Sequence, residues 1–404
     1  MRSRGARAGR APSSTRLATK LDAAWRNPLA VAAQWADAGT VHPGLLAHRA
    51  RGAFWDVLAE RRITLLVTRE YEHLLVALHA GRRGPEVSWL PLPHPNGLAV
   101  DAARGVVYVA STRNPNQLFE LAPVTGLLGS GGRRRAVAGR PLLPVRSRFL
   151  PGSLYLHDLA MVGGALHATA VGQNAVIRFS PDGDWSRAWW PRAIETGRRP
   201  RFDRNYLQLN SIAAGPTLAR SFFSASTGAP GPRRPGHRNF PVDRRGVIFS
   251  GRTREVVVRG LTRPHSARLH RGQLWVDDSG YGEVGICVEG RFRPVAGLPG
   301  WTRGLAFHGH LAFVGTSRIL PRFRHYAPGL DPARCVCGVH IVDTRHGHVL
   351  GSLLWPSGNQ IFAIEPVPAR FTTGFPLAAR ARHATAATRA LFSGFVTHTG
   401  KDAR

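Results

Sequence analysis

A strand pattern that recurs six times between residues 96 and 365 constrains the fold of this chain more than any other feature. In each copy a polar residue opens a short apolar strand, and in the first five copies a second strand that ends in small polar residues follows after a turn. The openers are separated by 61, 53, 55, 38 and 56 residues. Repeats of ~40–50 residues are typical of β-propeller blades, and loop insertions account for longer intervals. The six openers are Asn96, His157, Asn210, His265, Arg303 and Asn359.

The two ends of the repeat region complement each other. The sixth opener has no second strand after it, whereas residues 63–68, 73–78 and 87–92 have strand composition with no first strand before them. We therefore expect residues 359–365 to pair with 63–68, because this closure removes free sheet edges. The sequence predicts an all-β protein, a six-bladed β-propeller closed by its N- and C-terminal strands. A two-sheet β-sandwich is the alternative, but six equivalent openers have no natural place in it.

The regions on either side of the repeats differ in composition. We expect the propeller to span residues 51–366. Residues 1–50 are predicted to be a basic extension, partly disordered and partly helical, because 17–38 and 44–61 show helical spacing of apolar residues. Residues 367–404 are rich in Ala, Arg and Thr, which predicts a disordered tail.

The charge of the chain is strongly positive. Lys and Arg number 55 against 24 Asp and Glu, a net charge of +31, yet only Lys20 and Lys401 are lysines. So one-sided a choice, beside abundant Ala, Gly and Pro, indicates codon bias in a GC-rich genome. Surfaces that bind nucleic acid usually mix Lys with Arg and cluster them. Nucleic acid is therefore not the expected partner, although the charge still predicts attraction for anions.

Several classes of protein and site are excluded. No apolar run approaches 18 residues, so no membrane span is expected. Three cysteines exclude a disulfide framework, and Cys335-Val-Cys337 is too short for structural zinc. No apolar segment has the character of a secretory signal, so the expected location is cytoplasmic. Phosphate-loop, dinucleotide and nucleophile-elbow motifs are also missing from the sequence.

The openers are the first candidates for a functional site. First strands line the central channel of a propeller, so the six openers should ring one of its mouths. Asn and His at strand starts often bond nearby backbone, which is the simpler explanation for any single opener. Six polar openers that converge on one axis favour a ligand site.

The ends of the second strands should add polar neighbours on the same face: Arg69, Glu70, Arg113, Asn114, Gln173, Asn174, Asp277, Asp278 and Tyr281. For Asp277 and Asp278 the capping of a turn is an equal alternative. Strand alternation points Asp158 away from the channel unless its strand starts later.

Long insertions should cover the same mouth. They are rich in Arg, Pro and aromatic residues and span 128–153, 181–209, 228–246 and 318–334. Loops of this length usually carry function or are disordered. Trp189, Trp190, Phe202 and Tyr206 favour ordered loops over the channel mouth, and a solvated arginine face is the alternative.

Long strings in every blade carry a family resemblance. They include LLVTREYEHLL, PHPNGLAVD, LYLHDLA, RRPGHRNFPVDRRGVIFSG and LWVDDSGYGEVG. Over about residues 53–366 the chain resembles a bacterial family of conserved hypothetical proteins with a domain of unknown function. That family has no assigned activity, so the resemblance implies domain limits and no mechanism.

A more distant resemblance is to the NHL and gluconolactonase/senescence-marker six-bladed propellers. It is carried by PHPNGLAVD with Asn96 and by QLNSIAA with Asn210. In the gluconolactonase group, Asn and Asp at such openers and one Glu hold a divalent metal, and only these two residues match here.

The other openers depart from that metal-binding pattern. His157 and His265 replace oxygen ligands, and Arg303 adds a cation that would repel a metal. Glu365 comes late in its strand and is a poor match for the group's Glu. Ca²⁺ and Mg²⁺ are therefore disfavoured. Two His would suit Zn²⁺ or Fe²⁺ better, with Asp158 or Asp278 as carboxylate, so a divalent metal remains an open cofactor.

The first functional hypothesis is a binding propeller for an anionic small molecule, glycan or acidic peptide. Arg113 and Arg303 would supply paired donors to a carboxylate or phosphate. The further contacts would come from Asn96, Asn210, Asn359, Asn114, Asn174, Asp278 and Tyr281.

The second hypothesis is a hydrolase or lyase that acts on an acidic or sugar-derived substrate. His157 or His265 would be the general base, helped by Asp158 or Asp278, and Arg303 would stabilise developing negative charge. The third hypothesis is a protein-interaction scaffold that binds an acidic partner. Binding ranks first, because no catalytic set is recognisable and propellers host unrelated functions.

Overall fold

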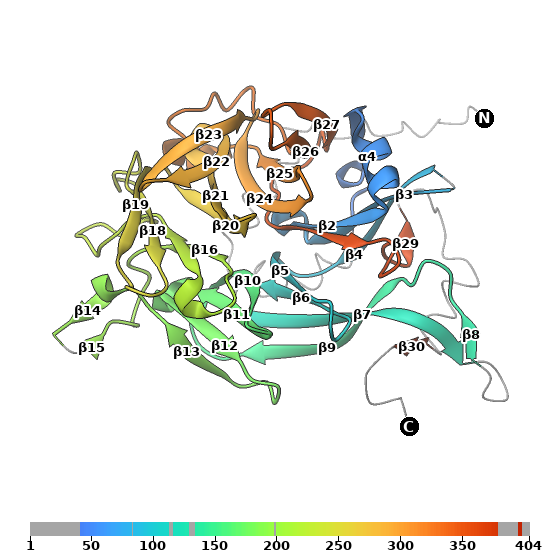
Figure 1. Cartoon of the computed structure of the whole chain (residues 1–404), viewed down its shortest axis with the longest axis horizontal. Helices are drawn as coiled ribbons and strands as arrows, with labels where there is room; N and C mark the ends of the chain where they lie inside the picture. The colour runs from blue at the N-terminus through green and yellow to red at the C-terminus, as the bar shows by residue number, and fades with distance from the viewer. Residues whose placement is uncertain are drawn as a thin grey trace, which may run out of the picture.

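The computed structural model describes residues 41–82, 84–112, 116–128, 134–197, 199–378 and 395–397. Within these ranges six antiparallel sheets stand around a central axis as the blades of a propeller (Figure 1). Both the all-β class and the six-bladed architecture predicted from the repeats are confirmed. No helix in the described part of the chain is long and apolar enough to cross a membrane.

The blades follow the chain in order, and in five of them the inner strand contains an opener near its start. Listed from the channel outward, the first blade contains β28 (Ile364–Pro368), β2 (Ile63–Arg69), β3 (Leu74–Gly81), β4 (Gly84–Pro91) and β29 (Leu377–Ala378). The second contains β5 (Pro95–Asp101), β6 (Val106–Ser111), β7 (Asn116–Leu128) and β9 (Leu142–Leu150), with β8 (Arg134–Ala136) and β30 (Phe395–Thr397) also paired to β7. The third contains β10 (Leu156–Val162), β11 (Ala165–Ala170), β12 (Ala175–Phe179) and β13 (Trp185–Trp189).

The remaining blades have the same plan. The fourth contains β16 (Leu209–Ala213), β17 (Phe222–Ala225), β18 (Gly246–Ser250) and β19 (Val256–Leu261). The fifth contains β20 (Pro264–His270), β21 (Gln273–Asp278), β22 (Glu283–Val288) and β23 (Arg291–Gly297). The sixth contains β24 (Trp301–His308), β25 (Leu311–Ser317), β26 (Gly338–Asp343), β27 (Val349–Leu354) and β1 (Arg49–Gly52).

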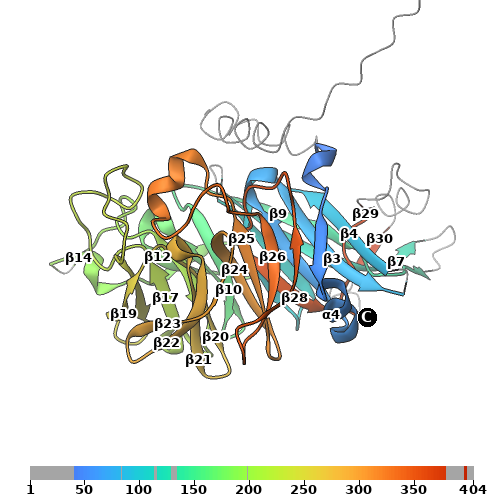
Figure 2. The same ribbon diagram turned by 90° about the horizontal axis from the view of Figure 1, so that it is seen from above.

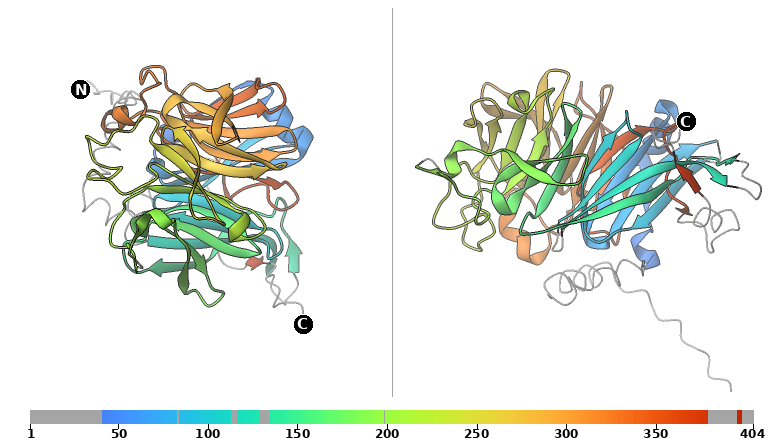
Figure 3. Two further views of the ribbon diagram at one scale, coloured as in Figure 1. Left: turned by 60° about the vertical axis from the view of Figure 1, so that its left-hand side comes forward. Right: turned by 90° about the horizontal axis from the view of Figure 1, so that it is seen from below.

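Short elements connect and cover the blades. The two-stranded sheet β14 (Glu195–Thr196) and β15 (Arg199–Pro200) stands apart from them. The helical elements are α4 (Phe54–Arg61) and the 3₁₀ turns η1 (Pro43–Leu45), η2 (Glu70–Glu72), η3 (Val171–Gln173), η4 (Arg192–Ile194), η5 (Leu218–Arg220), η6 (Ser279–Tyr281) and η7 (Pro321–Tyr326). In side view η7, in orange, and α4 lie on opposite faces of the disc (Figure 2). β7 and β9 extend beyond the ring (Figure 3).

The ring closes as expected, but with a later register. β2 pairs with β28, so that Ile63 faces Pro368 and Val67 faces Ile364. The inner strand therefore begins five residues after Asn359, and the segment before it follows an irregular path. An innermost strand has a partner on one side only, which is why it tolerates the prolines of β28.

The helical extension expected over residues 44–61 is shorter than that. Only α4 is an α-helix, and β1 forms a fifth strand of the sixth blade by pairing with β27. Gly52 separates the two elements at a positive φ of 58°, where a Cβ would lie 2.5 Å from the Leu350 oxygen. The segment 17–38 lies outside the described residues, and the domain limits remain a prediction.

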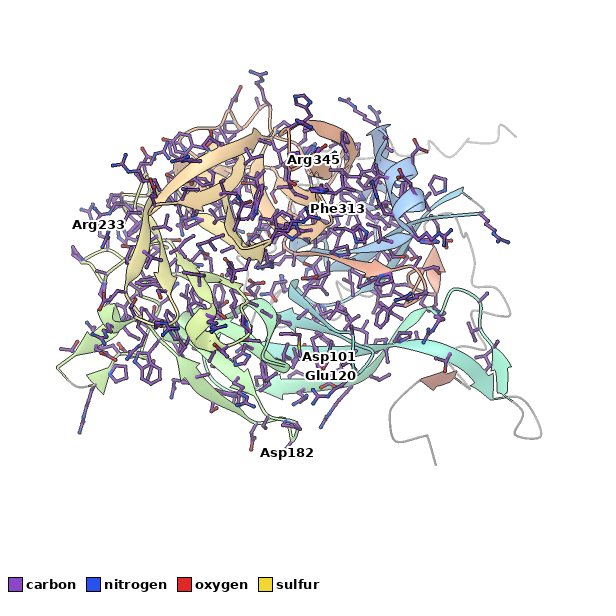
Figure 4. The ribbon with its side chains drawn as sticks, in the orientation of Figure 1. Asp101, Glu120, Asp182, Arg233, Phe313 and Arg345 are labelled. Atoms are coloured by element: carbon purple, nitrogen blue, oxygen red, sulfur yellow. The ribbon has the colours of Figure 1, made fainter. Side chains whose placement is uncertain are left out.

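A cluster of buried apolar side chains joins α4 to the first and sixth blades. Phe54 and Leu58 of the helix are fully buried in it, together with Leu65. Phe313, labelled in Figure 4, belongs to the same cluster. The helix thus covers the seam where the two ends of the chain meet.

A β-bulge follows the opener in five of the six inner strands. In β5, β10, β16, β20 and β24, the inner strand advances by one residue more than its partner. An extra residue of this kind bends the strand and redirects the side chains beside it.

Hydrogen bonds link the inner strands of neighbouring blades at these bulges. Asn96 Nδ2 donates to the Leu156 oxygen, and Asn210 Nδ2 donates to the Pro264 oxygen at 2.8 Å. Two further bonds of this kind run from His157 Nδ1 to the Asn210 oxygen (2.9 Å) and from the Gly304 amide to Ser266 Oγ (2.8 Å). From β2, the second strand of the first blade, Thr68 Oγ1 donates to the Asn96 oxygen (2.7 Å). Much of the ring is therefore connected through side chains at the channel.

We expect Gly97→Ala to destabilise the propeller by ~2 kcal/mol, as overpacking in a tight interior does. A Cβ at Gly97 would lie 2.8 Å from the Leu159 nitrogen of the next blade. Gly297→Ala is the control, because a Cβ there meets nothing within 4 Å. Urea unfolding of both variants measures the effect, and equal midpoints would show that the bulges tolerate looser contact than the structure indicates.

Candidate functional site

A cavity of about 180 Å³ occupies one mouth of the channel, and all six blades contribute to its lining. Its polar and charged residues are Glu70, Thr112, His157, Gln208, Arg263, His265, Arg303, Ser317, Arg318 and Gln360. Its aromatic and apolar residues are Tyr71, Tyr155, Trp301, Leu320, Phe323, Tyr326 and Phe362, and Gly236 completes the lining. The site is thus built from side chains that are distant in sequence.

Three of the six openers line this cavity: His157, His265 and Arg303. The other three do not. Asn96 and Asn210 use their amides to bond the next blade. Asn359 is buried, and neither polar atom of its side chain has a partner among the described residues.

The carboxylates expected to help the histidines lie elsewhere. Asp158 pairs with Arg268 at 2.9 Å and accepts from the Ile212 amide. Asp278 accepts from the Thr262 amide and pairs with Arg244 at 3.3 Å. The structure therefore does not bring these two carboxylates to the cavity.

The other residues expected to contact a ligand either hold loops in place or lie outside the described residues. Asn174 Oδ1 accepts from the amides of Tyr206 and Leu207 and so holds that loop. Tyr281 donates to Asp243 at 3.0 Å, away from the cavity. Arg113 and Asn114 lie outside the described residues.

The insertions contribute less to the site than their composition suggests. Leu320, Phe323 and Tyr326 come from the insertion that contains η7, and Gly236 comes from another. Arg233, in the same loop as Gly236, lies at the edge of the molecule in Figure 4.

Two tryptophans of the 181–209 insertion are used for packing. Trp189 packs on Phe223 of the fourth blade, and Trp190 packs on Phe202 within the insertion itself.

Sequence reasoning missed Tyr155, Gln208 and Arg263. Each stands two residues before an opener and has left-handed backbone, with φ of 51°, 55° and 55°. His94 holds the same position in the second blade, with φ of 43°. Non-glycine residues rarely adopt this conformation, and strained backbone tends to cluster at functional sites. The shared offset from the opener is the signal that could have identified these residues.

Arg303 contacts several of the other residues that line the cavity. Its guanidinium is nearly buried, lies 3.4 Å from the Phe362 ring centroid and donates from Nη2 to His157 Nε2 at 2.8 Å. The Gln360 amide fits between Arg303 and Glu70 when its oxygen accepts from Nη1 (2.5 Å) and its nitrogen donates to Glu70 Oε2 (2.8 Å). The Nε–H has no partner among the described residues. Since Arg carries five N–H donors, some remain for a ligand.

Arg263 brings a second guanidinium. It donates to Ser226 Oγ (3.1 Å) and to the Pro235 oxygen (2.6 Å), and Tyr326 covers one face at 3.7 Å. Burial lowers the pKa of both Arg263 and Arg303.

The two histidines of the cavity differ in their hydrogen-bond partners. His157 Nδ1 bonds the Asn210 oxygen, so its Nε2 lone pair is the acceptor for Arg303. His265 stacks on His157 with centroids 5.6 Å apart. Burial, followed by the charges of Arg303, His157 and Arg263, holds the pKa of His265 well below its usual value. The hydrogen bonds of His157 are those of a neutral ring, and the lowered pKa of His265 favours its neutral form.

The described residues contain no group of three His, Cys, Asp or Glu arranged to hold a metal ion. The lone pair of His157 that could bind a metal is already used by Arg303. With neither Asp158 nor Asp278 at the cavity, this donor set does not fit the Zn²⁺ or Fe²⁺ site considered from the sequence.

Residues 52–373 match the family described as a domain of unknown function, DUF4915. The chain belongs to the DUF4915 family. This match confirms the resemblance seen in the long strings of each blade. No curated protein matches the chain.

Three of the solved structures that are similar to this DUF4915 protein are compared with it by their sequence identity, TM-score and coverage of the two chains. One is a chain of a nidogen/laminin complex (12% identity, TM-score 0.49, covering 75% of this chain and 98% of that one). Another is a protein of unknown function from Bacteroides caccae (12%, 0.49, 76% and 99%). The third is a putative gluconolactonase (15%, 0.38, 66% and 89%). Likeness at these identities and scores carries no argument about activity.

The buried Asp278 should give the protein a characteristic pH dependence. Burial raises its pKa to about 7, against ~3.9 for an unfolded Asp. The folded protein therefore binds this proton more tightly, and stability falls as the pH rises between those values. The Asp278→Asn variant lacks this titrating group and so lacks the loss of stability. The melting temperature of the variant minus that of the wild type should therefore increase from pH 5 to pH 8.

Thermal unfolding at four pH values between 5 and 8 measures this difference. Asp182→Asn is the control, because it removes the same charge from an exposed turn (Figure 4). A difference between Asp278→Asn and wild type that stays constant with pH would contradict the raised pKa.

Proposed function

We propose that this propeller binds an anionic small molecule in the cavity at the channel mouth. The observation that carries this proposal is the charge of the lining: Arg263, Arg303 and Arg318 face one carboxylate, Glu70. Two of the three arginines are nearly fully buried. Buried charges are expensive unless they are paired, and a bound anion would supply the missing partner.

The remaining donors suit a carboxylate or a phosphate. Arg303 uses Nη2 for His157 and Nη1 for Gln360, and since each of these nitrogens carries two hydrogens, part of this donor capacity is left for a ligand. A guanidinium binds such groups through paired, charge-assisted hydrogen bonds. The aromatic rings of Trp301, Phe323 and Phe362 offer apolar contact to the rest of a ligand.

The size of the cavity favours a small ligand over a folded partner. At about 180 Å³ it is smaller than the ~300–1,000 Å³ of typical drug-sized sites. A glycan or an acidic peptide would therefore enter with one charged terminal group only.

The hydrolase or lyase alternative depends on His265. His157 cannot accept a proton while Arg303 occupies its Nε2. Nδ1 of His265 bonds the Arg263 oxygen and Ser279 Oγ, and no carboxylate of the described residues contacts it. A general base works best with a pKa near the operating pH, and that of His265 is lowered well below it. Binding without chemistry is the better account of this arrangement.

We expect Arg303→Lys to weaken anion binding by about 10- to 100-fold, because charge-assisted hydrogen bonds of this kind contribute ~1.5–3 kcal/mol. Lysine keeps the charge but loses the planar fork. Calorimetric titration with phosphate, sulfate, phenylacetate and mandelate measures the change. Arg252→Lys, on an exposed turn, is the matched control.

Two results would count against the site. If none of the four anions binds the wild-type protein, the proposed function is wrong. If Arg303→Lys and Arg252→Lys bind equally well, the anion binds somewhere other than this cavity.

A further inference from the structure

We infer that the anion bound here carries a hydrogen-bond donor beside its charged group, as a 2-hydroxycarboxylate or a protonated phosphate does. This inference rests on the proposed function and names the ligand class of the same cavity. The residue that decides it is His265, which presents an acceptor next to the arginines.

The hydrogen bonds of His265 fix which ring nitrogen carries the proton. Nδ1 lies 2.9 Å from the Arg263 oxygen and 3.1 Å from Ser279 Oγ. Ser279 already donates its own hydrogen to the Thr302 oxygen at 2.6 Å. Both neighbours of Nδ1 are therefore acceptors, so the hydrogen of the neutral ring is on Nδ1 and the lone pair is on Nε2.

The Nε2 lone pair lies in a cavity whose charged side chains are three arginines and one carboxylate, Glu70. His265 lines the cavity, and none of the described residues bonds its Nε2. The lowered pKa of the ring, caused first by burial and then by Arg303, His157 and Arg263, keeps this nitrogen unprotonated at neutral pH. His157 offers no such acceptor, because Arg303 takes its lone pair.

An anion without a donor would meet this lone pair unfavourably. Its oxygens are acceptors, so they would satisfy the guanidinium of Arg303 but leave Nε2 unpaired. A buried polar group without a partner costs enough to weaken binding by about tenfold or more. A ligand whose hydroxyl lies next to its anionic group satisfies both sides, and sites of this kind discriminate strongly against analogues that lack the hydroxyl.

Two matched pairs of probes test the inference at pH 6.5 with the full-length protein. Mandelate and phenylacetate differ by one hydroxyl beside the carboxylate. Phosphate and sulfate are similar tetrahedral anions, but only phosphate carries a proton at this pH. Calorimetry should show mandelate and phosphate binding at least about tenfold more tightly than their partners. The two pairs also distinguish a hydroxy acid from a phosphate as the better ligand.

His265→Asn locates the preference. The Asn amide can still donate to the Arg263 oxygen, but it has no atom at the position of Nε2. We expect the ratio of affinities within each pair to fall close to one. His157→Asn is the comparison, because it removes the neighbouring ring and leaves the His265 acceptor in place, so the ratio should persist. Melting temperatures show whether each variant is folded.

The outcomes separate this inference from the proposed function. Equal affinities within both pairs for the wild-type protein overturn the inference and leave the anion site standing, whatever the variants do. A preference that persists unchanged in folded His265→Asn also overturns it. Absence of binding by all four probes contradicts the proposed function, and the inference with it.

Discussion

The hydrogen bonds that join the inner strands of neighbouring blades are the constraint on which the channel depends. Asn96 and Asn210 reach across to the backbone of the next blade, and Thr68 of β2 makes a corresponding bond from the first blade to the second. Each bond fixes the spacing of two strands at the point where a bulge turns the chain. Because the bulges set the direction of the side chains beside them, the same bonds decide which residues reach the cavity.

This division of roles accounts for the chemistry of the site. The side chains of Asn96 and Asn210 bond the next blade and are not free to contact a ligand. His157 bonds the next blade and also lines the cavity: Nδ1 donates to the Asn210 oxygen of the fourth blade, and Nε2 accepts from Arg303. One acid of the inner strands is used as well, because Asp158 pairs with Arg268. The cavity is left with the buried guanidinium groups of Arg263 and Arg303 and one carboxylate, Glu70, and this balance is the basis of the proposed anion binding.

The sequence predicted the fold well because a six-fold pattern has few solutions, and each opener heads an inner strand or the turn before it. It predicted the site less well. Nothing in residue type indicated that Tyr155 and Arg263 adopt left-handed backbone. Asp158, expected to help the histidines, instead pairs with Arg268. Similarly, β1 has the sequence RARG with every residue exposed, so no apolar pattern marks it as a strand. Its position depends on the free edge of β27, which is a tertiary property.

The late register of the ring closure affects how this protein is made. β2 emerges from the ribosome early, but its partner β28 (Ile364–Pro368) is among the last ordered segments to be synthesised. At ~5–20 residues per second, the edge of β2 stays unpaired for about 15–60 s, long enough to recruit other strands. Fusions or pauses that delay the C-terminal segment should therefore increase aggregation during translation, even though the finished ring has no such edge.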